Sequence, residues 1–474
     1  MIDVTEQKQR VAVIGGGITG LTAAFYLQQE AKEKKLPLEI VLIESSHRIG
    51  GKIQTVRKEN FIVERGPDSY IDNNNSMAKL VKDLGIEDQL IRNEAGQTFI
   101  TANEKLYPVP AGSILGIPTQ LSSFLTSEIV SWSGKIRAVC DLWIPRSRVR
   151  EEDQPLGKFI RRRFGKETVE NIIEPLLSGV VAGDIDQLSL QSTFPKFMKM
   201  EKEYRSLITG MKNTPTDLII KESVGNKNRP FRTFKNGLET LIEALEARLV
   251  DTTILKSVKV ESIAKTAHQV TLSLNNKSSI AADAVIIATP HLITQKMFAK
   301  QQLLQSLQQI PLTTVATVTM AFPIHAIDEN FTGTELVVAR NSDFSITACS
   351  WTHRKWPLAA PEGYALLKSY VGRSGDEAIV DLSDSEIEKV VLQDLNRVTP
   401  VEGNPIFTVV SRWKEAMPQY TVGHARRLEA AKQELNEHYP TLKLIGSSYE
   451  GTSLPDCVDQ ARNAAAEILI NLFE

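Results

Sequence analysis

The sequence predicts an α/β fold that begins with a buried parallel sheet. The first observation is the apolar run Val11–Ile14, which is typical of a fully buried parallel strand. The second is the spacing G-x-G-x-x-G directly after it, formed by Gly15, Gly17 and Gly20. The third is a helix-compatible stretch behind the glycines, with apolar side chains spaced to face a core. Strand, glycine turn and helix in this order favour a Rossmann-like unit.

Each glycine of this turn has a separate physical role. Gly15 makes the tight turn, Gly17 lets the backbone approach a pyrophosphate, and Gly20 lets the helix pack closely on the strand. The phosphates then lie at the positive N-terminus of the helix. A second apolar strand, residues 39–44, ends in Glu44, which follows Gly20 by 24 residues and has the spacing of a ribose-binding carboxylate. We therefore predict a dinucleotide site; the alternative is a glycine turn that binds nothing.

Composition excludes several classes of partner. The 474 residues suffice for two or three domains, and the net charge of −2 gives no reason to expect nucleic acid. The three cysteines, Cys140, Cys349 and Cys457, lack C-x-x-C spacing, which disfavours a disulfide framework or a structural zinc site. No two histidines have H-x-x-x-H spacing, so we expect no metal site.

The chain also lacks the signals of a membrane or secreted protein. Its polar start leaves no room for a signal peptide, and no uncharged apolar run reaches the roughly 18–20 residues of a spanning helix. We expect a cytoplasmic protein without an integral membrane segment, which at most touches a membrane surface.

A second pair of turns follows the dinucleotide motif. The glycines Gly50–Gly51 let the backbone run close to a flat or anionic group, and Arg48 and Lys52 place positive charge beside them. Without a ligand this segment would be a loop with two solvated cations. The strand that starts at Phe61 then runs into the turn Gly66–Ser69.

These segments resemble the FAD-binding N-terminus of the flavin amine oxidase superfamily, which includes monoamine oxidases, phytoene desaturases and protoporphyrinogen oxidases. The resemblance implies that the double-glycine segment passes along the pyrophosphate and flavin and that the second turn lines the isoalloxazine edge. The FAD-binding residues that it implies here are Gly15, Gly16, Gly17, Ile18, Thr19, Gly20, Glu44, Ser45, Arg48, Gly51, Lys52, Gly66, Pro67, Asp68 and Ser69.

Periodicity predicts the remaining elements. Ser383 and Glu386 have the spacing of a capping box that opens a helix running to Val398, and Ser76 has the character of an N-cap. The polar residues 212–230 are expected to form a mobile loop. Helices are expected at 76–85, 121–132, 134–143, 156–164, 167–177, 238–249, 383–398, 426–439 and 458–473, and strands at 258–263, 270–274, 284–290, 313–322, 335–340, 344–351, 364–372, 407–413 and 443–447.

Two segments in the middle of the chain carry charge or unusual composition. Arg161–Arg163 is expected to be a solvated face of a helix, with a set of carboxylate-binding cations as the alternative. The stretch Glu174–Asp184 is unusually small and apolar, which indicates backbone close to a large ligand. Together with Ser192-Thr-Phe-Pro and Arg205-Ser-Leu-Ile, it resembles the porphyrinogen-oxidising branch of the superfamily.

The C-terminal part supplies a second ligand-facing helix N-terminus, between the strand 443–447 and the last helix. The resemblance implies that the backbone at Thr452, Ser453 and Leu454 meets the isoalloxazine and ribityl chain and that Val260 contacts adenine through its backbone. Trp413 is expected to pack against the flavin or its pocket, with a core aromatic as the alternative.

The expected architecture is a Rossmann-like FAD-binding domain, with a parallel sheet and a β-meander, joined to a substrate domain with a mixed antiparallel sheet and to a helical insertion. The FAD-binding domain comprises residues 1–90, 231–296 and 408–474. The substrate domain comprises residues 91–110, 201–230 and 297–407, and the helical insertion residues 111–200.

Within the superfamily, the chain resembles the soluble bacterial enzymes that oxidise coproporphyrinogen III to coproporphyrin III in haem synthesis. The resemblance implies FAD as cofactor, dioxygen as acceptor and hydrogen peroxide as product, over three flavin cycles that pass hydride to flavin N5. It also allows contact with the haem-pathway enzymes that act next. Tyr370 is the candidate catalytic side chain, with a merely structural tyrosine as the alternative, and Arg205, Arg340 and Lys368 are candidates for binding propionates.

Three alternatives remain open. Protoporphyrinogen IX could be the substrate, although its two propionates need fewer cations than the four of coproporphyrinogen. An amine oxidase or carotenoid desaturase is disfavoured by Glu174–Asp184 and by the absence of a cysteine placed for covalent flavin attachment. A non-catalytic binder like the GDP-dissociation inhibitors would lack a flavin-facing C-terminal segment, and a colourless purified protein would favour it.

Overall fold

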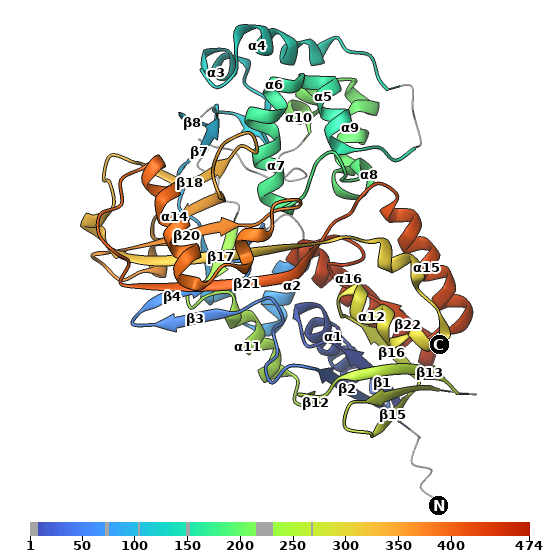
Figure 1. The fold of residues 1–474 in the computed structure, drawn as a ribbon. Helices are drawn as coiled ribbons and strands as arrows, with labels where there is room; N and C mark the ends of the chain where they lie inside the picture. Colours follow the sequence, from blue (N-terminus) through green and yellow to red (C-terminus); the bar gives the residue numbers. More distant parts are fainter. Residues whose placement is uncertain (1–7, 72–74, 103–104, 148–151, 215–230, 267–268) are drawn as a thin grey trace, which may run out of the picture.

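The computed structural model describes residues 8–71, 75–102, 105–147, 152–214, 231–266 and 269–474. Most of the loop predicted at 212–230 lies outside these residues. Figure 1 shows three bodies of structure: a parallel sheet with its helices, a mixed sheet beside it, and a group of helices at the far end. The predicted division of the chain into three domains at the boundaries given above stays a prediction.

The parallel sheet has five strands in the order β12-β2-β1-β16-β22. Alternate residues of its strands face opposite sides. One side packs against the helices α1, α2, α11 and α16, and the other packs against the small sheet β13-β14-β15 and the helices α12 and α15. The elements are β1 (Gln9–Ile14), β2 (Leu38–Glu44), β12 (Thr252–Lys256), β16 (Ala284–Ile287), β22 (Leu442–Leu444), β13 (Val260–Lys265), β14 (Val270–Leu274), β15 (Ser279–Ala282), α1 (Ile18–Lys34), α2 (Asn75–Leu84), α11 (Glu239–Arg248), α12 (His291–Met297), α15 (His424–His438) and α16 (Leu454–Phe473). The predicted α/β class, with a parallel sheet and a meander, is confirmed.

The mixed sheet has seven strands in the order β21-β17-β20-β19-β18-β7-β8. Among these strands the pair β18 and β7 is parallel and the others are antiparallel. Helix α14 (Asp384–Val398) packs its apolar residues on one face of the sheet, and its predicted capping box between Ser383 and Glu386 is present. The strands are β7 (Gln97–Ala102), β8 (Lys105–Pro108), β17 (Leu312–Pro323), β18 (Gly333–Val338), β19 (Ile346–Trp351), β20 (Tyr364–Val371) and β21 (Phe407–Pro418).

The short strands form three further sheets. They are a sheet of β5 (Tyr70–Ile71), β11 (Phe231–Phe234) and β6 (Leu90–Arg92), a hairpin of β9 (Ser113–Ile114) with β10 (Ile117–Pro118) in the helical part, and the hairpin of β3 (Thr55–Lys58) with β4 (Phe61–Glu64). Because β4 is followed directly by the turn at Gly66, this hairpin delivers that turn to the boundary between the parallel and the mixed sheet.

The helical part differs from the prediction between residues 126 and 132. The helix expected at 121–132 is wrong, because α3 ends at Thr126 and a new helix starts at Trp132. The reason is Ser131, whose hydroxyl accepts a hydrogen bond from the amide of Gly134 and so caps the new helix. The helices are α3 (Leu121–Thr126), α4 (Trp132–Val139), α5 (Leu156–Phe164), α6 (Lys166–Thr168), α7 (Glu174–Val181), α8 (Leu190–Thr193), α9 (Pro195–Tyr204) and α10 (Leu207–Asn213).

The prediction of a solvated face at Arg161–Arg163 is also wrong. Arg163 is fully buried and forms ion pairs with Asp141 and Glu201, and Arg162 pairs with the same Glu201. Arg161 pairs with Asp186, whose side chain is 55% exposed. The three arginines bind carboxylates of the protein itself, because helix α5 lies between the segments that carry those acids.

Two helix starts were misplaced by the sequence. Helix α2 begins at Asn75, so Ser76 lies within its first turn, where the Ser76 hydroxyl donates a hydrogen bond to Asp459. Helix α16 begins at Leu454 rather than at residue 458, because Ser453 and Asp456 form a capping box. The second correction moves the helix N-terminus to the segment at Thr452 and Ser453.

Candidate functional site

The glycine turn after β1 is closed on two sides and open on the third. A Cβ on Gly20 would lie 1.9 Å from the carbonyl oxygen of Gly15, and Gly15 itself has a φ of 108°, so neither position accepts a side chain. A Cβ on Gly17 would meet no atom of the described residues within 4 Å. The turn therefore borders open space at Gly17, where a ligand can approach the backbone.

Glu44 lies at the end of β2 and bonds to this turn. Its Oε2 accepts a hydrogen bond of 2.6 Å from the amide of Gly16, and its Oε1 accepts from the amide of Ser46 at 2.7 Å and from the hydroxyl of Ser45 at 3.3 Å. The amide of Val258 donates to the Glu44 carbonyl at 3.0 Å, which brings the strand that carries Val260 to the same edge. The carboxylate therefore fixes the glycine turn and stands where the ribose-binding acid is predicted.

The double-glycine segment runs beside the glycine turn. The amide of Gly50 donates to the carbonyl of Gly16 at 2.7 Å, and a Cβ on Gly51 would lie 3.2 Å from the Cα of Gly17. Arg48 donates to the carbonyls of Gly51 at 3.1 Å and of Ile53 at 2.8 Å and pairs with Glu239 on α11 at 2.8 Å. Arg48 thus holds the shape of this segment.

The N-termini of α1 and α16 meet at the same place. A Cβ on Gly446 would lie 3.7 Å from Oγ1 of Thr19, and α1 and α16 pack against each other. Ile18 and Thr19 form the first turn of α1, and Thr452 to Leu454 form the start of α16. Two neighbouring helix N-termini favour an anionic group, because each helix dipole has its positive end there.

The second predicted turn, at Gly66, is held from several directions. A Cβ on Gly66 would lie 2.0 Å from the carbonyl of Lys52, and Lys52 donates to the carbonyl of Ala416. The indole Nε1 of Trp413 donates to the carbonyl of Arg65 at 2.9 Å, and Lys368 donates to the carbonyl of Gly66 at 2.8 Å. The turn with Pro67 and its neighbours therefore joins the two glycine segments to the strands β20 and β21.

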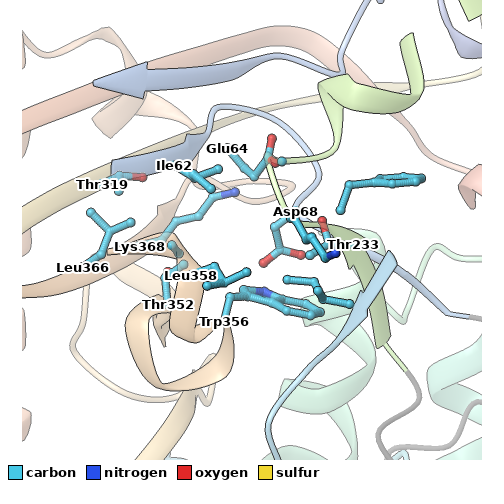
Figure 2. A pocket seen from close by; sticks show the side chains of 15 residues that line it. Ile62, Glu64, Asp68, Thr233, Thr319, Thr352, Trp356, Leu358, Leu366 and Lys368 are labelled. Carbon is cyan, nitrogen blue, oxygen red and sulfur yellow. The ribbon is translucent and has the colours of Figure 1, made fainter. Parts of the chain in front are cut away.

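A small cavity lies behind this turn (Figure 2). Its volume of about 30 Å³ is enough for one or two water molecules, and Glu64, Asp68 and Lys368 line it. Burial raises the pKa of Glu64 to about 7. Burial acts in the same direction on the pKa of Asp68, but the ammonium groups of Lys355 and Lys368 outweigh it and the net pKa shift is downward. The hydroxyl of Ser69 adds a hydrogen bond of 2.6 Å to Asp68.

Tyr370 lies on β20, two residues after Lys368. The Lys368 ammonium is 5.3 Å from the centre of its ring, and burial raises the pKa of the phenol well above its ordinary value. Tyr370 is therefore a protonated hydroxyl at neutral pH, able to donate a hydrogen bond but unsuited to be a base.

The three cations predicted to bind propionates have different surroundings in the structure. Lys368 is 2% exposed, and its ammonium donates a hydrogen bond to the carbonyl of Gly66. The ammonium is therefore already bound to the backbone of this turn. Arg205 donates to the carbonyl of Leu142 at 3.0 Å. Arg340 lies 3.5 Å from the carboxylate of Glu174, at the boundary between the mixed sheet and α7.

Two contributors to the site were missed by the sequence analysis. Thr317 on β17 donates to the carbonyl of Arg65 at 3.0 Å, and Lys355 stands 3.9 Å from Asp68. No local motif marks either residue, since their partners lie more than 200 residues away in the sequence.

Comparison with known proteins gives consistent results. The sequence matches the family described as flavin containing amine oxidoreductase over residues 18–469. It is 46% identical to coproporphyrinogen III oxidase of Bacillus subtilis, over 99% of this chain and 100% of that protein. It is 39% identical to coproporphyrinogen III oxidase of Staphylococcus aureus, over 98% and 99% of the two chains.

One solved structure is also similar to this chain in fold and in sequence. The crystal structure of a protein from Exiguobacterium superimposes with a TM-score of 0.87 at 35% identity, covering 98% of this chain and 99% of that one. Within the described residues, no helix is both long and apolar enough to cross a membrane.

Proposed function

Because the chain belongs to the family of flavin-containing amine oxidoreductases and has FAD as its cofactor, we propose that it oxidises coproporphyrinogen III to coproporphyrin III in haem synthesis. Dioxygen is the acceptor and hydrogen peroxide the product in this proposal. The observation that carries it is the identity of 46% over the whole length of the Bacillus subtilis enzyme. The proposal also retains the three-part division of the chain given by the sequence.

The residues present fit FAD. The open space at Gly17, the adjoining Gly51 and the two helix N-termini suit a pyrophosphate, because backbone amides and dipole ends are favourable for anions. Glu44 would receive the ribose hydroxyls and Val260 the adenine. The turn of Gly66 to Ser69, Trp413 and the start of α16 would hold the isoalloxazine. Bound FAD accepts two electrons at a time, so three rounds remove the six electrons that separate porphyrinogen from porphyrin.

In this proposal the chain binds and orients the substrate and no strong base is required. The hydrogens of a porphyrinogen are already labile. Lys368 is committed to the Gly66 carbonyl, and its pKa is lowered by burial. We propose that Tyr370 contacts the substrate as a hydrogen-bond donor, which its raised pKa keeps protonated.

We further propose that the protein works in the cytoplasm, where its product passes to the next enzymes of haem synthesis, and that it touches membranes peripherally. Trp132 and Ile136 are one helical turn apart on α4 and are 68% and 65% exposed, and Trp143 nearby is 68% exposed. Aromatic and aliphatic side chains of this kind favour the membrane–water interface. Co-sedimentation with anionic vesicles tests the contact: the Trp132→Ala, Trp143→Ala variant should stay in the supernatant, and equal binding of both proteins contradicts it.

The activity is tested by supplying coproporphyrinogen III to the purified yellow protein while porphyrin fluorescence, oxygen and peroxide are followed together. The proposal predicts porphyrin formation with three molecules of dioxygen consumed and three of hydrogen peroxide formed per porphyrin. Porphyrin formation without oxygen uptake would replace the acceptor but leave the oxidase. A colourless protein without turnover would favour a non-catalytic binder and overturn the proposal.

A further inference from the structure

Two arginines away from the glycine turns lie at one edge of the mixed sheet. Arg340 follows β18 and Arg373 follows β20. These strands run in the same direction because both are antiparallel to β19 between them, so their ends point to the same edge. Helix α7 packs against β18 at this edge, and the amide of Ser374 donates to the carbonyl of Ala182 at the end of α7 at 3.3 Å.

Arg340 is only partly used by the protein. Its Nε lies 3.5 Å from Oε1 of Glu174, a long contact, while its side chain stays 33% exposed. Its Nη2 is buried and has no hydrogen-bond partner among the described residues. An enclosed guanidinium nitrogen without an acceptor is unfavourable, so an acceptor that reached Nη2 along the exposed third of the Arg340 side chain would stabilise it.

Arg373 adds a second guanidinium next to the first. Its side chain is 15% exposed and its carboxylate partner, Asp376, lies 3.5 Å away and is 55% exposed. Burial lowers the pKa of Arg373, and the nearby positive charge of Arg340 lowers it further. The two arginines thus repel each other in a place where water screens them little.

Glu174 is the buried carboxylate that faces these arginines. Its side chain is 6% exposed, and burial raises its pKa against the opposing effect of Arg340 and Arg161. Ser178 follows it by one helical turn on the same face of α7, and the Ser178 hydroxyl is likewise buried without a hydrogen-bond partner in the described part of the chain. The edge therefore has more donors than acceptors.

The donor excess fits one further carboxylate. Arginine binds a carboxylate through two parallel hydrogen bonds, and a carboxylate between Arg340 and Arg373 would relieve both the repulsion and the unpaired Nη2. Lys368 lies three residues before the end of β20 at Val371, and Arg373 follows two residues after that end, so about 10 Å of extended strand already separates Lys368 from the sheet edge. A ligand reaching from the Gly66 turn to this edge would have the size of a tetrapyrrole with its side chains.

We propose that Arg340 and Arg373 form a carboxylate-binding subsite for a propionate of the porphyrinogen, and that Glu174 is the internal carboxylate facing it when no substrate is bound. This inference rests on the proposed function. Arg340 was a candidate from the sequence, whereas Arg373 and the role of Glu174 come from the fold.

The test measures the dissociation constant of coproporphyrin III by fluorescence titration, together with kcat and KM for coproporphyrinogen III. Arg340→Gln and Arg373→Gln should each raise the dissociation constant and KM about tenfold or more, with FAD content unchanged. The matched control is Arg57→Gln, which also removes one guanidinium but only from an exposed pair with Glu243, and it should leave both constants unchanged. Unchanged constants in both test variants overturn the subsite.

Two further measurements separate this proposal from a structural role. Glu174→Gln removes the competing negative charge and should tighten binding of coproporphyrin III, whereas a structural role predicts weaker binding. The tetramethyl ester of coproporphyrin III carries no carboxylate and should bind wild type and the arginine variants alike. If the wild-type protein oxidises neither coproporphyrinogen III nor protoporphyrinogen IX, the proposed function is refuted. If the wild type is active and the arginine variants bind coproporphyrin III as it does, only the subsite is refuted.

Discussion

The glycine turn after β1 and the arginine edge of the mixed sheet are built from different materials. At the glycine turn, the groups that face the open space are backbone amides, and side chains are excluded by distances such as 1.9 Å at Gly20. At the sheet edge, the groups are the guanidinium ions of Arg340, which faces the buried Glu174, and of Arg373, which pairs with the exposed Asp376. The proposed cofactor site therefore depends on local chain geometry, whereas the proposed substrate subsite depends on which distant segments of the chain pair.

The glycine turn is tested most strongly by two substitutions with opposite outcomes. Gly17→Val should abolish FAD retention, because its side chain fills the open space, while the apoprotein loses no more than about 2 kcal/mol of stability, since Gly17 is the N-cap of α1 and valine is a poor cap. Gly20→Ala should lose about 3 kcal/mol or more, since its Cβ collides with the Gly15 carbonyl. Flavin absorbance and urea unfolding of the apoproteins measure both, and equal flavin content in Gly17→Val and wild type contradicts the cofactor site.

Breaking a buried ion pair of the helical part should lower the stability of the protein. Arg163→Met should cost about 3–5 kcal/mol of unfolding free energy, because it leaves Asp141 buried without its cation. Arg161→Gln, the control on the same helix, breaks a pair with an exposed acid and should cost less than about 1 kcal/mol. Similar losses in the two variants, measured by urea unfolding, would show that burial does not distinguish these arginines.

Glu64, which lies beside the turn at Gly66, should make the stability of the protein depend on pH. Its pKa of about 7 in the folded protein is above the ordinary value of 4.5, so the folded state holds the proton more tightly than the unfolded state. Its contribution to stability is therefore present at pH 5 and is lost as pH rises towards 8. The gain in stability of Glu64→Gln over wild type should grow by roughly 1–3 kcal/mol across this range. A difference that is constant with pH, at saturating FAD, would refute the raised pKa.

Glu44 differs from the other groups at the glycine turn, because it contributes a side chain where those groups are backbone amides. Glu44→Ala should weaken FAD binding by roughly 1–3 kcal/mol, since it removes the acceptor for Gly16 and the predicted ribose ligand. FAD titration of the apoprotein, with Glu39→Ala as an exposed acidic control, gives the value. An unchanged dissociation constant would mean that Glu44 only closes the strand.

The elements around the glycine turn were easier to predict from the sequence than the contacts between distant side chains. The strand Val11–Ile14, the glycine spacing and the capping box at Ser383 are local signals, and the structure confirms these elements. The sequence failed at Arg163, whose carboxylates stand 22 and 38 residues away, because a run of cations looks the same whether solvated or buried. Arg373 and Thr317 went unnoticed for the same reason: their roles exist only once strands from different parts of the chain are side by side.

The proposed substrate is tested by the ratio of kcat/KM for coproporphyrinogen III to kcat/KM for protoporphyrinogen IX. Enzyme kept anaerobic with either substrate is mixed with oxygenated buffer, and porphyrin fluorescence is followed. We expect a preference for coproporphyrinogen III of about tenfold or more, because its two additional propionates bring charged hydrogen bonds that the other substrate lacks. A clear preference for protoporphyrinogen IX would contradict the substrate assignment.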